Sequence, residues 1–568
     1  MLNIFFATLT SSVILFGSGI IFNYLFLNDE GNHQKNIYET GIFGIIFLSF
    51  FALFLNFFLP INKLVGSVIS IVSTMSFFYF IYLYKKKLDL IFIILIASFV
   101  SFALITLSNI NRPDAGLYHL PFVSLLHESK IIIGSVNIHH RFGHISIIQY
   151  LSAIHNNYIF KTEFINVPLA SIFSFYIIFI FKKFFDNLRK NDFGKIFINF
   201  LIIIFSFYAF NRYGNYGNDA PVHIFFFILI IFFLEINNLK EIQLNEFYKI
   251  VILSLFLISL KPFMVIVLLL PLILFYLNKK KLFLIKKKQF FICLFLISIW
   301  FLKNILISGC LIYPLNKSCI KSLIYFDEKN TLTRSYEGEA WSKSVPDSKE
   351  KFSSHKEYIK KFNWLPTWKE NHLKKIVEKI LPYLILLFLI LIIVILRKIY
   401  FRENSNKSSI DEKDYILLFF SFYCCAIWFL KFPLYRFGMS FIFIFITLLF
   451  IFLLKKMENF NNFKFYNYIF TTLIIVGVLG FLGKNFYRIV NKFDKKYNNY
   501  PWPKIYTLSD TKENILPNYK KIVDEKNQTL FYYSNGVECM YSEAPCSNYS
   551  NPKLKLITKY GYKIYYKD

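Results

Sequence analysis

The densest polar chemistry of the sequence lies between residues 111 and 155, which hold six of the ten histidines. The stretch begins "NRPDAGLYHLPFVSLLHESK", in which Asp114 follows Arg112 and precedes Tyr118 and His119. A carboxylate near a hydroxyl and an imidazole can act as a general base while its neighbours bind substrate through hydrogen bonds. A surface ion pair between Asp114 and Arg112 at a helix start is the alternative interpretation.

Proline spacing predicts the local structure around Asp114. Pro113 suits the first position of a short helix, so Asp114 would lie in the first turn, where the helix dipole favours a negative charge. Tyr118 would follow one turn later on the same face. Pro121 restricts the residue before it, so we expect the helix to be interrupted and two short pieces to lie along the surface.

A second polar motif, "NIHHRFGH", contains His139, His140, Arg141 and His144. His140 and His144 are spaced like two metal ligands on one helical face, but the glutamate of the known zinc signature is missing, and Gly143 disfavours a regular helix. We therefore predict that His139, His140 and Arg141 bind substrate or stabilise the loop. A zinc site is the alternative that this spacing leaves open.

Three further ionisable residues stand at the ends of apolar runs: Asp219 in "NYGNDAPVH", Lys261 in "SLKPF" and Arg436 in "KFPLYRFG". Ionisable groups in such positions either line a polar cavity or anchor at the membrane surface, and both interpretations stay open for Lys261 and Arg436. We expect these residues to matter chemically only if they converge with Asp114.

The elements that position these residues are apolar runs of transmembrane length. The chain has 568 residues, of which 56% are hydrophobic and 17% charged. A helix needs about 20 apolar residues to cross a bilayer. The sequence predicts an all-α polytopic membrane protein with about fourteen spans, which begin near Ile4, Gly41, Leu64, Leu90, Phe164, Ile196, Ala220, Ile250, Pro262, Gln289, Val377, Tyr415, Gly438 and Tyr468.

The formal net charge of +29 is concentrated in short loops after alternate spans, which is the positive-inside pattern and not a nucleic-acid-binding surface. We assign these clusters to the cytoplasm: Lys85 to Lys87, Lys182 with Lys183, Arg189 with Lys190, Lys279 to Lys281, Lys286 to Lys288, Arg397 with Lys398 and Arg402, and Lys455 with Lys456. Residues 109–160, 309–375 and the tail from Asn491 then face outward. This assignment requires the apolar segment 144–160 to be an interfacial helix.

The cysteines agree with this topology. Cys293, Cys424 and Cys425 lie inside predicted spans, whereas the other four fall in loops assigned outward, where disulfides persist: Cys310, Cys319, Cys539 and Cys546. Two pairs are close in sequence, but three pairings and four free thiols all remain open.

The chain divides into N-terminal transmembrane helices (1–89), a membrane core (90–486) with outer loops 109–160 and 309–375, and a small extracytoplasmic C-terminal domain (487–568). In the tail, "TLFYYS" and "LKLITKYGYKIYY" alternate as β-strands do, so this domain should be β-rich.

Four motifs, "RPDAGLYHLP", "GSVNIHHRFG", "WFLKNILISGCLIYPL" and "FPLYRFG", resemble multi-spanning bacterial proteins of the GT-C superfamily of integral-membrane glycosyltransferases. The resemblance covers residues 90–450 approximately and implies a GT-C-like membrane core. In that superfamily an acidic residue of the first outer loop serves as base or metal partner, and Asp114 matches it. A second acidic residue often accompanies it, for which Asp219 is the candidate. A divalent cation is therefore compatible with the sequence but not required by it.

The function expected from the resemblance is transfer of a hexose or pentose from a polyprenyl-phosphate carrier to a glycan or lipid acceptor of the cell envelope, at the outer face of a bacterial inner membrane. Lys261 or Arg436 would stabilise the leaving phosphate, and Tyr118 and His119 would bind sugar hydroxyls. The alternatives are an envelope oligosaccharide polymerase or ligase and a polysaccharide or lipid transporter (flippase); a transporter should carry charges at mid-span. The sequence contains no nucleotide-binding motif.

Overall fold

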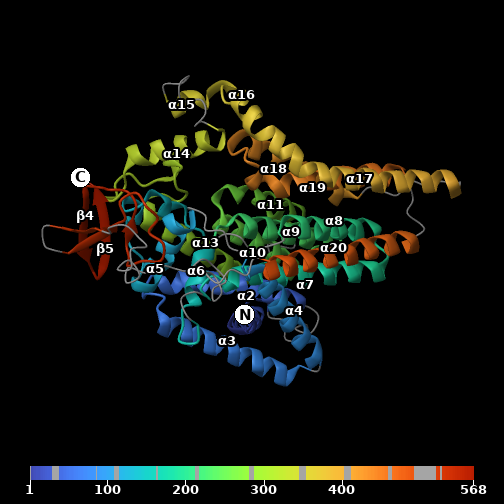
Figure 1. Ribbon diagram of the computed structural model, residues 1–568, viewed down its shortest axis with the longest axis horizontal. Coiled ribbons are helices and arrows are strands. Elements are labelled where there is room, and N and C mark those ends of the chain that lie inside the picture. The colour runs from blue at the N-terminus through green and yellow to red at the C-terminus, as the bar shows by residue number, and fades with distance from the viewer. Residues whose placement is uncertain are drawn as a thin grey trace.

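The computed structural model describes residues 2–27, 37–84, 86–107, 114–160, 164–210, 216–279, 287–344, 354–401, 411–457, 463–491, 520–524 and 528–567. These residues form a predominantly helical protein with a small strand-containing region at the C-terminal end (Figure 1). Some features used in the sequence predictions lie outside the described residues: Lys85, Arg112, Pro113, Lys280, Lys281, Lys286, Arg402 and residues 492–519.

Ten helical segments within the described residues are long and apolar enough to cross a membrane. They are α1 (Leu2–Phe22) with the turn Asn23–Leu27, α2 (Ile37–Asn56), α3 (Lys63–Leu83), α4 (Lys87–Ile105), α7 (Val167–Lys190), α13 (Lys287–Ser308), α16 (Leu365–Trp368) continuing through Lys369–Leu373 into α17 (Lys374–Phe401), α18 (Glu412–Lys431), α19 (Tyr435–Met457) and α20 (Phe463–Asn491). The prediction of a helical multi-span protein is thus confirmed.

The remaining four predicted spans are also helices, but each is at most 17 residues long. They are α8 (Phe193–Ala209), α9 (Asp219–Glu235), α10 (Leu244–Leu260), and the 3₁₀ turn Pro262–Leu268 followed by α11 (Leu269–Leu277). The count of fourteen crossings therefore stays a prediction.

Helix α9 forms the centre of the bundle. Its residues from Pro221 to Leu234 are all buried, as expected for a helix that is hydrophobic around its whole circumference. It contacts α7, α8, α10 and α19 (Figure 1). Because α9 is enclosed, its first residue, Asp219, is held at a fixed end of the bundle.

The N-terminal helices pack closely on this core through small residues. A Cβ atom added to Gly44 of α2 would lie 1.8 Å from the carbonyl oxygen of Leu15 in α1, so only glycine permits this approach. Helix α1 also contacts α3, α4 and α7.

The histidine-rich loop, residues 114–160, folds into short helical elements. These are the π-helical turn Ala115–His119, α5 (Leu120–Glu128), the 3₁₀ turns Ser135–Asn137 and His140–His144, and α6 (Ile148–Ile154). Pro121 does not interrupt the first piece, because it stands in the first turn of α5, where its missing N–H costs no hydrogen bond. Every residue from Leu120 to His127 and from Ile148 to Ile154 is buried. The predictions of surface helices and of an interfacial helix are therefore wrong.

The bundle anchors this loop by hydrogen bonds. The Lys303 ammonium of α13 donates to the Ile145 carbonyl over 2.9 Å, and the Ile147 amide donates to the Ser259 carbonyl of α10 over 3.1 Å. On the other side, Ser11 of α1 bonds His155 over 3.1 Å. The loop is consequently part of the core.

The described C-terminal residues contain five strands: β1 (Lys520–Val523), β2 (Thr529–Tyr533), β3 (Cys546–Ser547), β4 (Leu554–Lys559) and β5 (Tyr562–Lys567). β1 and β2 are antiparallel, β2 and β3 parallel, and β4 and β5 form an antiparallel hairpin. Both predicted strand runs are confirmed. The strands lie at one end of the molecule beside α5 (Figure 1), and Tyr565 bonds the Ile133 carbonyl through its amide over 2.9 Å.

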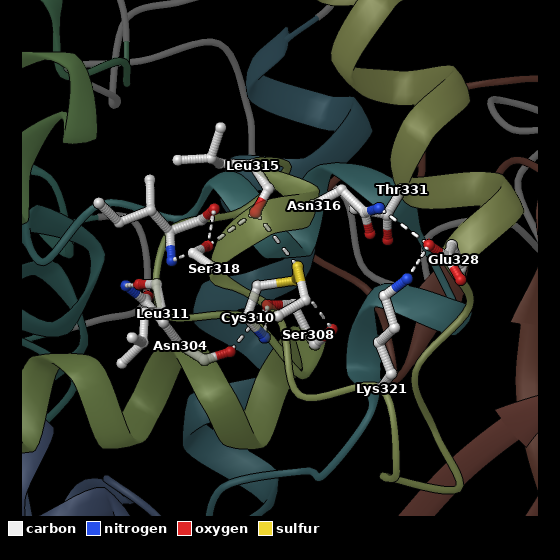
Figure 2. The surroundings of a disulfide bond; sticks show 12 residues. Asn304, Ser308, Cys310, Leu311, Leu315, Asn316, Ser318, Lys321, Glu328 and Thr331 are labelled. Atoms are coloured by element: carbon white, nitrogen blue, oxygen red, sulfur yellow. Dashed lines mark hydrogen bonds and ion pairs between the residues drawn. A yellow bond between two sulfur atoms is a disulfide. The ribbon is translucent and has the colours of Figure 1, made fainter.

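The second outer segment begins after α13 and leads to α14 (Glu328–Ser342). A disulfide joins Cys310 to Cys319, and Lys321 forms an ion pair with Glu328 at 2.5 Å (Figure 2). Asn316 also donates to Glu328, over 3.0 Å. A second disulfide joins Cys539 to Cys546. The two bridges join cysteines that are nine and seven positions apart in the sequence. Each closes a short loop in one of the segments that surround the histidine-rich loop.

Candidate functional site

Asp114 lies at the start of the histidine-rich loop and pairs with Arg141 of the second polar motif. The Asp114 Oδ1 atom is 2.6 Å from Nη1 of Arg141, and both side chains are partly exposed. The same guanidinium lies 5.0 Å from the centre of the Tyr118 ring. Arg141 therefore contacts Asp114 and Tyr118 together, as expected for residues on one face of a helix.

His119 is buried and neutral. Burial lowers the pKa of its imidazole to about 4, while the carboxylates of Asp114 and Asp219 oppose this shift. Nε2 of Gln149 lies 2.9 Å from Nδ1 of His119, so the amide donates and the imidazole proton resides on Nε2. That nitrogen would lie 3.8 Å from a Cβ atom added to Gly217, two residues before Asp219.

Asp219 joins two cations from different elements. Its Oδ1 accepts a hydrogen bond from Lys261 Nζ over 2.7 Å, and its Oδ2 lies 3.9 Å from Nε of Arg436. The Lys261 side chain is largely buried, whereas 44% of the Arg436 side chain is exposed. One carboxylate facing two cations leaves a local net charge of +1, with Arg436 as the accessible positive group.

Neighbouring contacts fix Asp219, Lys261 and Arg436, here called the Asp219 trio, in place. Asn218, the residue before Asp219, donates to the Leu260 carbonyl beside Lys261. The imidazole of His223 donates from Nε2 to the Arg436 carbonyl over 2.9 Å and accepts from Ser440 at Nδ1 over 2.8 Å. The start of α9, the end of α10 and the start of α19 thus meet at one point.

The charges of both ion pairs act on Tyr118 and His119. Burial raises the pKa of the Tyr118 hydroxyl, and the charges of Asp114, Arg141, Asp219 and Arg436 all act on it. The structure therefore brings Asp114, Tyr118, His119, Arg141, Asp219, Lys261 and Arg436 into one region. Arg112 lies outside the described residues.

His139 and His140 form the outer edge of this region. Their rings stack with centroids 5.1 Å apart, and Nε2 of His139 donates to Oδ1 of Asn548 over 3.0 Å. Burial lowers the pKa of His139 to about 3 and that of His140 to about 2. Both imidazoles are neutral at physiological pH.

One acidic residue of this region was not predicted. The carboxylate of Glu538 lies so close to Gly116 that a Cβ atom there would be 2.3 Å from Oε2. Glu538 is more than 400 positions from Asp114 in sequence, and only its neighbour Cys539, held in a disulfide, hinted that its position is fixed. The structure thereby adds a third carboxylate near the start of the loop.

Within the described residues, no group of three histidine, cysteine, aspartate or glutamate side chains is arranged to hold a metal ion. Among the described residues, His140 and His144 are therefore not joined by a third side chain that could complete a metal site.

Residues 1–443 match a family described as "Domain of unknown function (DUF8201)". The chain belongs to this family. The match includes the whole histidine-rich loop and both ion pairs, and it ends in α19 before the C-terminal strands. No curated protein and no solved structure matches the chain.

These groups form a surface that can position a polar substrate. It offers carboxylates as hydrogen-bond acceptors, the partly exposed guanidinium groups of Arg141 and Arg436 for an anion, and neutral aromatic and imidazole rings. A carboxylate within hydrogen-bond reach of a hydroxyl can act as a general base, and a guanidinium stabilises the charge that develops on a leaving phosphate.

Proposed function

We propose that the protein is a GT-C-like membrane glycosyltransferase that transfers a sugar from a polyprenyl-phosphate carrier to a glycan or lipid of the cell envelope. The observation that carries this proposal is that two ion-paired carboxylates, Asp114 and Asp219, lie close enough to Tyr118 and His119 for their charges to act on both. Residues far apart in sequence supply a base and a phosphate-binding cation to the same region.

In this mechanism Asp114 accepts the proton of the acceptor hydroxyl as that oxygen attacks the anomeric carbon. The bond from the anomeric carbon to the phosphate oxygen breaks, and the phosphate of the carrier leaves with its negative charge. Arg436 stabilises that charge, because its guanidinium is the accessible cation of the Asp219 trio. Lys261, which is buried against Asp219, holds the trio together.

The proposal includes the membrane topology. We place about fourteen crossings in a bacterial inner membrane, with the histidine-rich loop, the 309–375 segment and the C-terminus outside the cytoplasm. The two disulfides support this placement, because such bonds persist in oxidising compartments. In intact cells a membrane-impermeant maleimide should label Tyr560→Cys in the exposed β4–β5 turn but not Lys190→Cys at the end of α7; the reverse pattern would overturn the topology.

The transfer reaction is tested with purified full-length protein in lipid vesicles that contain an undecaprenyl-phosphate sugar carrying a radiolabel. Wild-type protein should release label from the carrier to an envelope extract, and Asp114→Asn should lower that rate by at least 100-fold. Asp186→Asn is the matched control, because Asp186 pairs with Lys182 on the partly exposed face of α7. Equal rates for wild type and Asp114→Asn would remove Asp114 from the mechanism.

One observation favours a transporter as a second candidate. Glu39 of α2 is buried between Lys183 of α7 and Lys249 of α10, with Nζ atoms 3.2 and 2.6 Å from its carboxylate. Charges inside a helical bundle often mark a transport pathway. A flippase should move a fluorescent polyprenyl-phosphate lipid across vesicles, and Asp114→Asn should leave this movement unchanged. Absence of movement with folded wild-type protein would overturn this candidate.

A further inference from the structure

An aromatic cluster lies next to Asp114 and includes residues from the C-terminal segment. The Tyr549 ring is 5.2 Å from the His139 ring and 5.4 Å from the His140 ring, in tilted arrangements. His139 in turn faces Tyr118, with centroids 6.5 Å apart. Four rings from three separate parts of the chain therefore form one cluster.

This cluster reaches the outside of the molecule. Tyr549 is 45% exposed, and Tyr118 and His140 are partly exposed, whereas His139 is buried beneath them. The hydrogen bond from His139 to Asn548 attaches the C-terminal residues to the histidine-rich loop. The backbone of Tyr549 is itself held, because its amide donates to the Ser547 hydroxyl over 3.1 Å. The rings are consequently held in place before any ligand binds.

The charges around the cluster are compensated. Arg141 is paired with Asp114, and Arg334 of α14, whose charge acts on His140, is paired with Glu337 at 2.6 Å. The two imidazoles are neutral because burial lowers the pKa of both. A ligand bound here therefore meets aromatic faces and paired polar groups, with no uncompensated cation among the residues named.

We propose that Tyr549 and Asn548, together with His140 and Tyr118, form a binding subsite for an uncharged pyranose ring. The C–H face of a pyranose is weakly positive and packs on the negative face of an aromatic ring. Its hydroxyls suit hydrogen-bonding groups such as the Asn548 amide. The inference rests on the proposed transferase function for the role of this sugar, which is the acceptor beside the general base.

The location of the subsite has a consequence for substrate choice. Asp114, Tyr118 and His140 belong to the region that matches the family, whereas Asn548 and Tyr549 lie beyond its end at residue 443. The C-terminal segment therefore supplies one wall of the subsite, and changes there would alter sugar preference without touching the general base.

Saturation-transfer NMR on full-length protein in lipid nanodiscs tests the subsite, with methyl glucoside, methyl galactoside and N-acetylglucosamine as probes. At least one sugar should receive magnetisation at its ring C–H protons. Tyr549→Ala should reduce that transfer at least fivefold, while Tyr549→Phe, which keeps the ring, should retain at least half of it. Tyr560→Ala is the matched control, because Tyr560 is an exposed tyrosine of the same segment outside the cluster.

The same measurement separates this inference from the proposed function. Asp114→Asn should still bind the sugar while losing transfer from the lipid-linked donor. If no sugar binds, or if Tyr549→Ala binds as wild type does, the subsite is wrong even where transfer is observed. If a sugar binds through Tyr549 and no transfer occurs from any polyprenyl-phosphate sugar, the subsite stands and the transferase function falls.

Discussion

The amide of Met540 donates a hydrogen bond to the carbonyl oxygen of Gly116 over 2.9 Å. This contact joins the C-terminal segment to the helical turn that begins beside Asp114. Further bonds reinforce it: Ser124 donates to the Ser542 carbonyl, and the Tyr541 hydroxyl bonds His127. The C-terminal strands are thus a structural part of the candidate site, although they lie outside the region that matches the family.

A single methyl group at Gly116 should disturb this junction. A Cβ atom there would lie 2.3 Å from Glu538 Oε2 and 2.4 Å from Met540 Sδ, so Gly116→Ala must displace the C-terminal segment. We expect Gly116→Ala to lower the free energy of unfolding by about 1–3 kcal/mol. Gly338→Ala in α14 is the matched control, since a Cβ there meets nothing within 4 Å. Unfolding by denaturant in detergent measures both, and equal stabilities would contradict the observed packing.

Acid should destabilise the histidine-rich loop. Burial lowers the pKa of His119, His127 and His155 to about 4, against 6.5 for an exposed histidine. Below pH 6.5 these histidines bind protons in the unfolded chain but not in the folded protein. The free energy of unfolding therefore falls as the pH drops from about 6.5 to about 4. At pH 5 each of these histidines should cost about 2 kcal/mol.

His127→Gln provides a direct check, because glutamine can hydrogen-bond Tyr541 and does not titrate. The loss of stability between pH 7.5 and pH 5, measured by thermal unfolding in detergent, should shrink by about 2 kcal/mol in this variant. His355→Gln, on the outer helix α15 (His355–Tyr358), should leave the loss unchanged. A pH profile identical to wild type in His127→Gln would show that His127 does not contribute.

Glu39 should be essential for folding regardless of function. Its carboxylate is the shared partner of the Lys183 and Lys249 ammonium groups inside the bundle, so Glu39→Gln leaves two buried charges without it. Breaking a buried ion pair by removing one partner costs about 3–5 kcal/mol. Adding Lys249→Met to Glu39→Gln should recover part of this loss. Asp186→Asn, which breaks only a partly exposed pair, should cost less than about 1 kcal/mol.

Some of this architecture could be predicted from the sequence because it depends on local patterns. Hydrophobic runs of about 20 residues indicate membrane helices wherever they occur. The sequence places Asp219 and Lys261 at ends of such runs assigned to the same side, but it does not predict their ion pair. Alternation in "LKLITKYGYKIYY" similarly predicted the strands β4 and β5.

Other features depend on contacts between distant parts of the chain. Nothing near Glu538 or Tyr549 in sequence indicates that they lie against Gly116 and His140. The charge assignment predicts an interfacial helix over residues 144–160, because this apolar segment carries His144, Gln149 and His155 and must not cross the membrane. The polar side chains of α6 (Ile148–Ile154) are nevertheless buried within the protein. Gln149, for example, bonds His119. Burial of this helix by α2, α3, α5 and α7 is invisible in the local pattern.

Arg436 and Lys261 should have separable roles although both pair with Asp219. Lys261 is largely buried and 2.7 Å from Asp219, so Lys261→Met leaves the partly buried carboxylate with the more distant Arg436 as its cation and should lower the unfolding free energy by about 1–3 kcal/mol. Arg436 is 3.9 Å away and half exposed, so Arg436→Gln should cost less than about 1 kcal/mol.

Arg436→Gln should have a small effect on stability but a large effect on sugar transfer. Because Arg436 is the cation that a carrier phosphate can reach, Arg436→Gln should lower kcat/KM for a polyprenyl-phosphate sugar by about 100-fold, which corresponds to about 2.7 kcal/mol of transition-state stabilisation. Arg436→Lys should recover part of the rate, since a lysine supplies charge without the bidentate geometry. The control is Arg334→Gln, which removes a guanidinium paired with Glu337 and should leave the donor KM unchanged. If Arg436→Gln transfers sugar at the wild-type rate and Arg334→Gln does not, the phosphate site lies nearer to α14 than to the Asp219 trio.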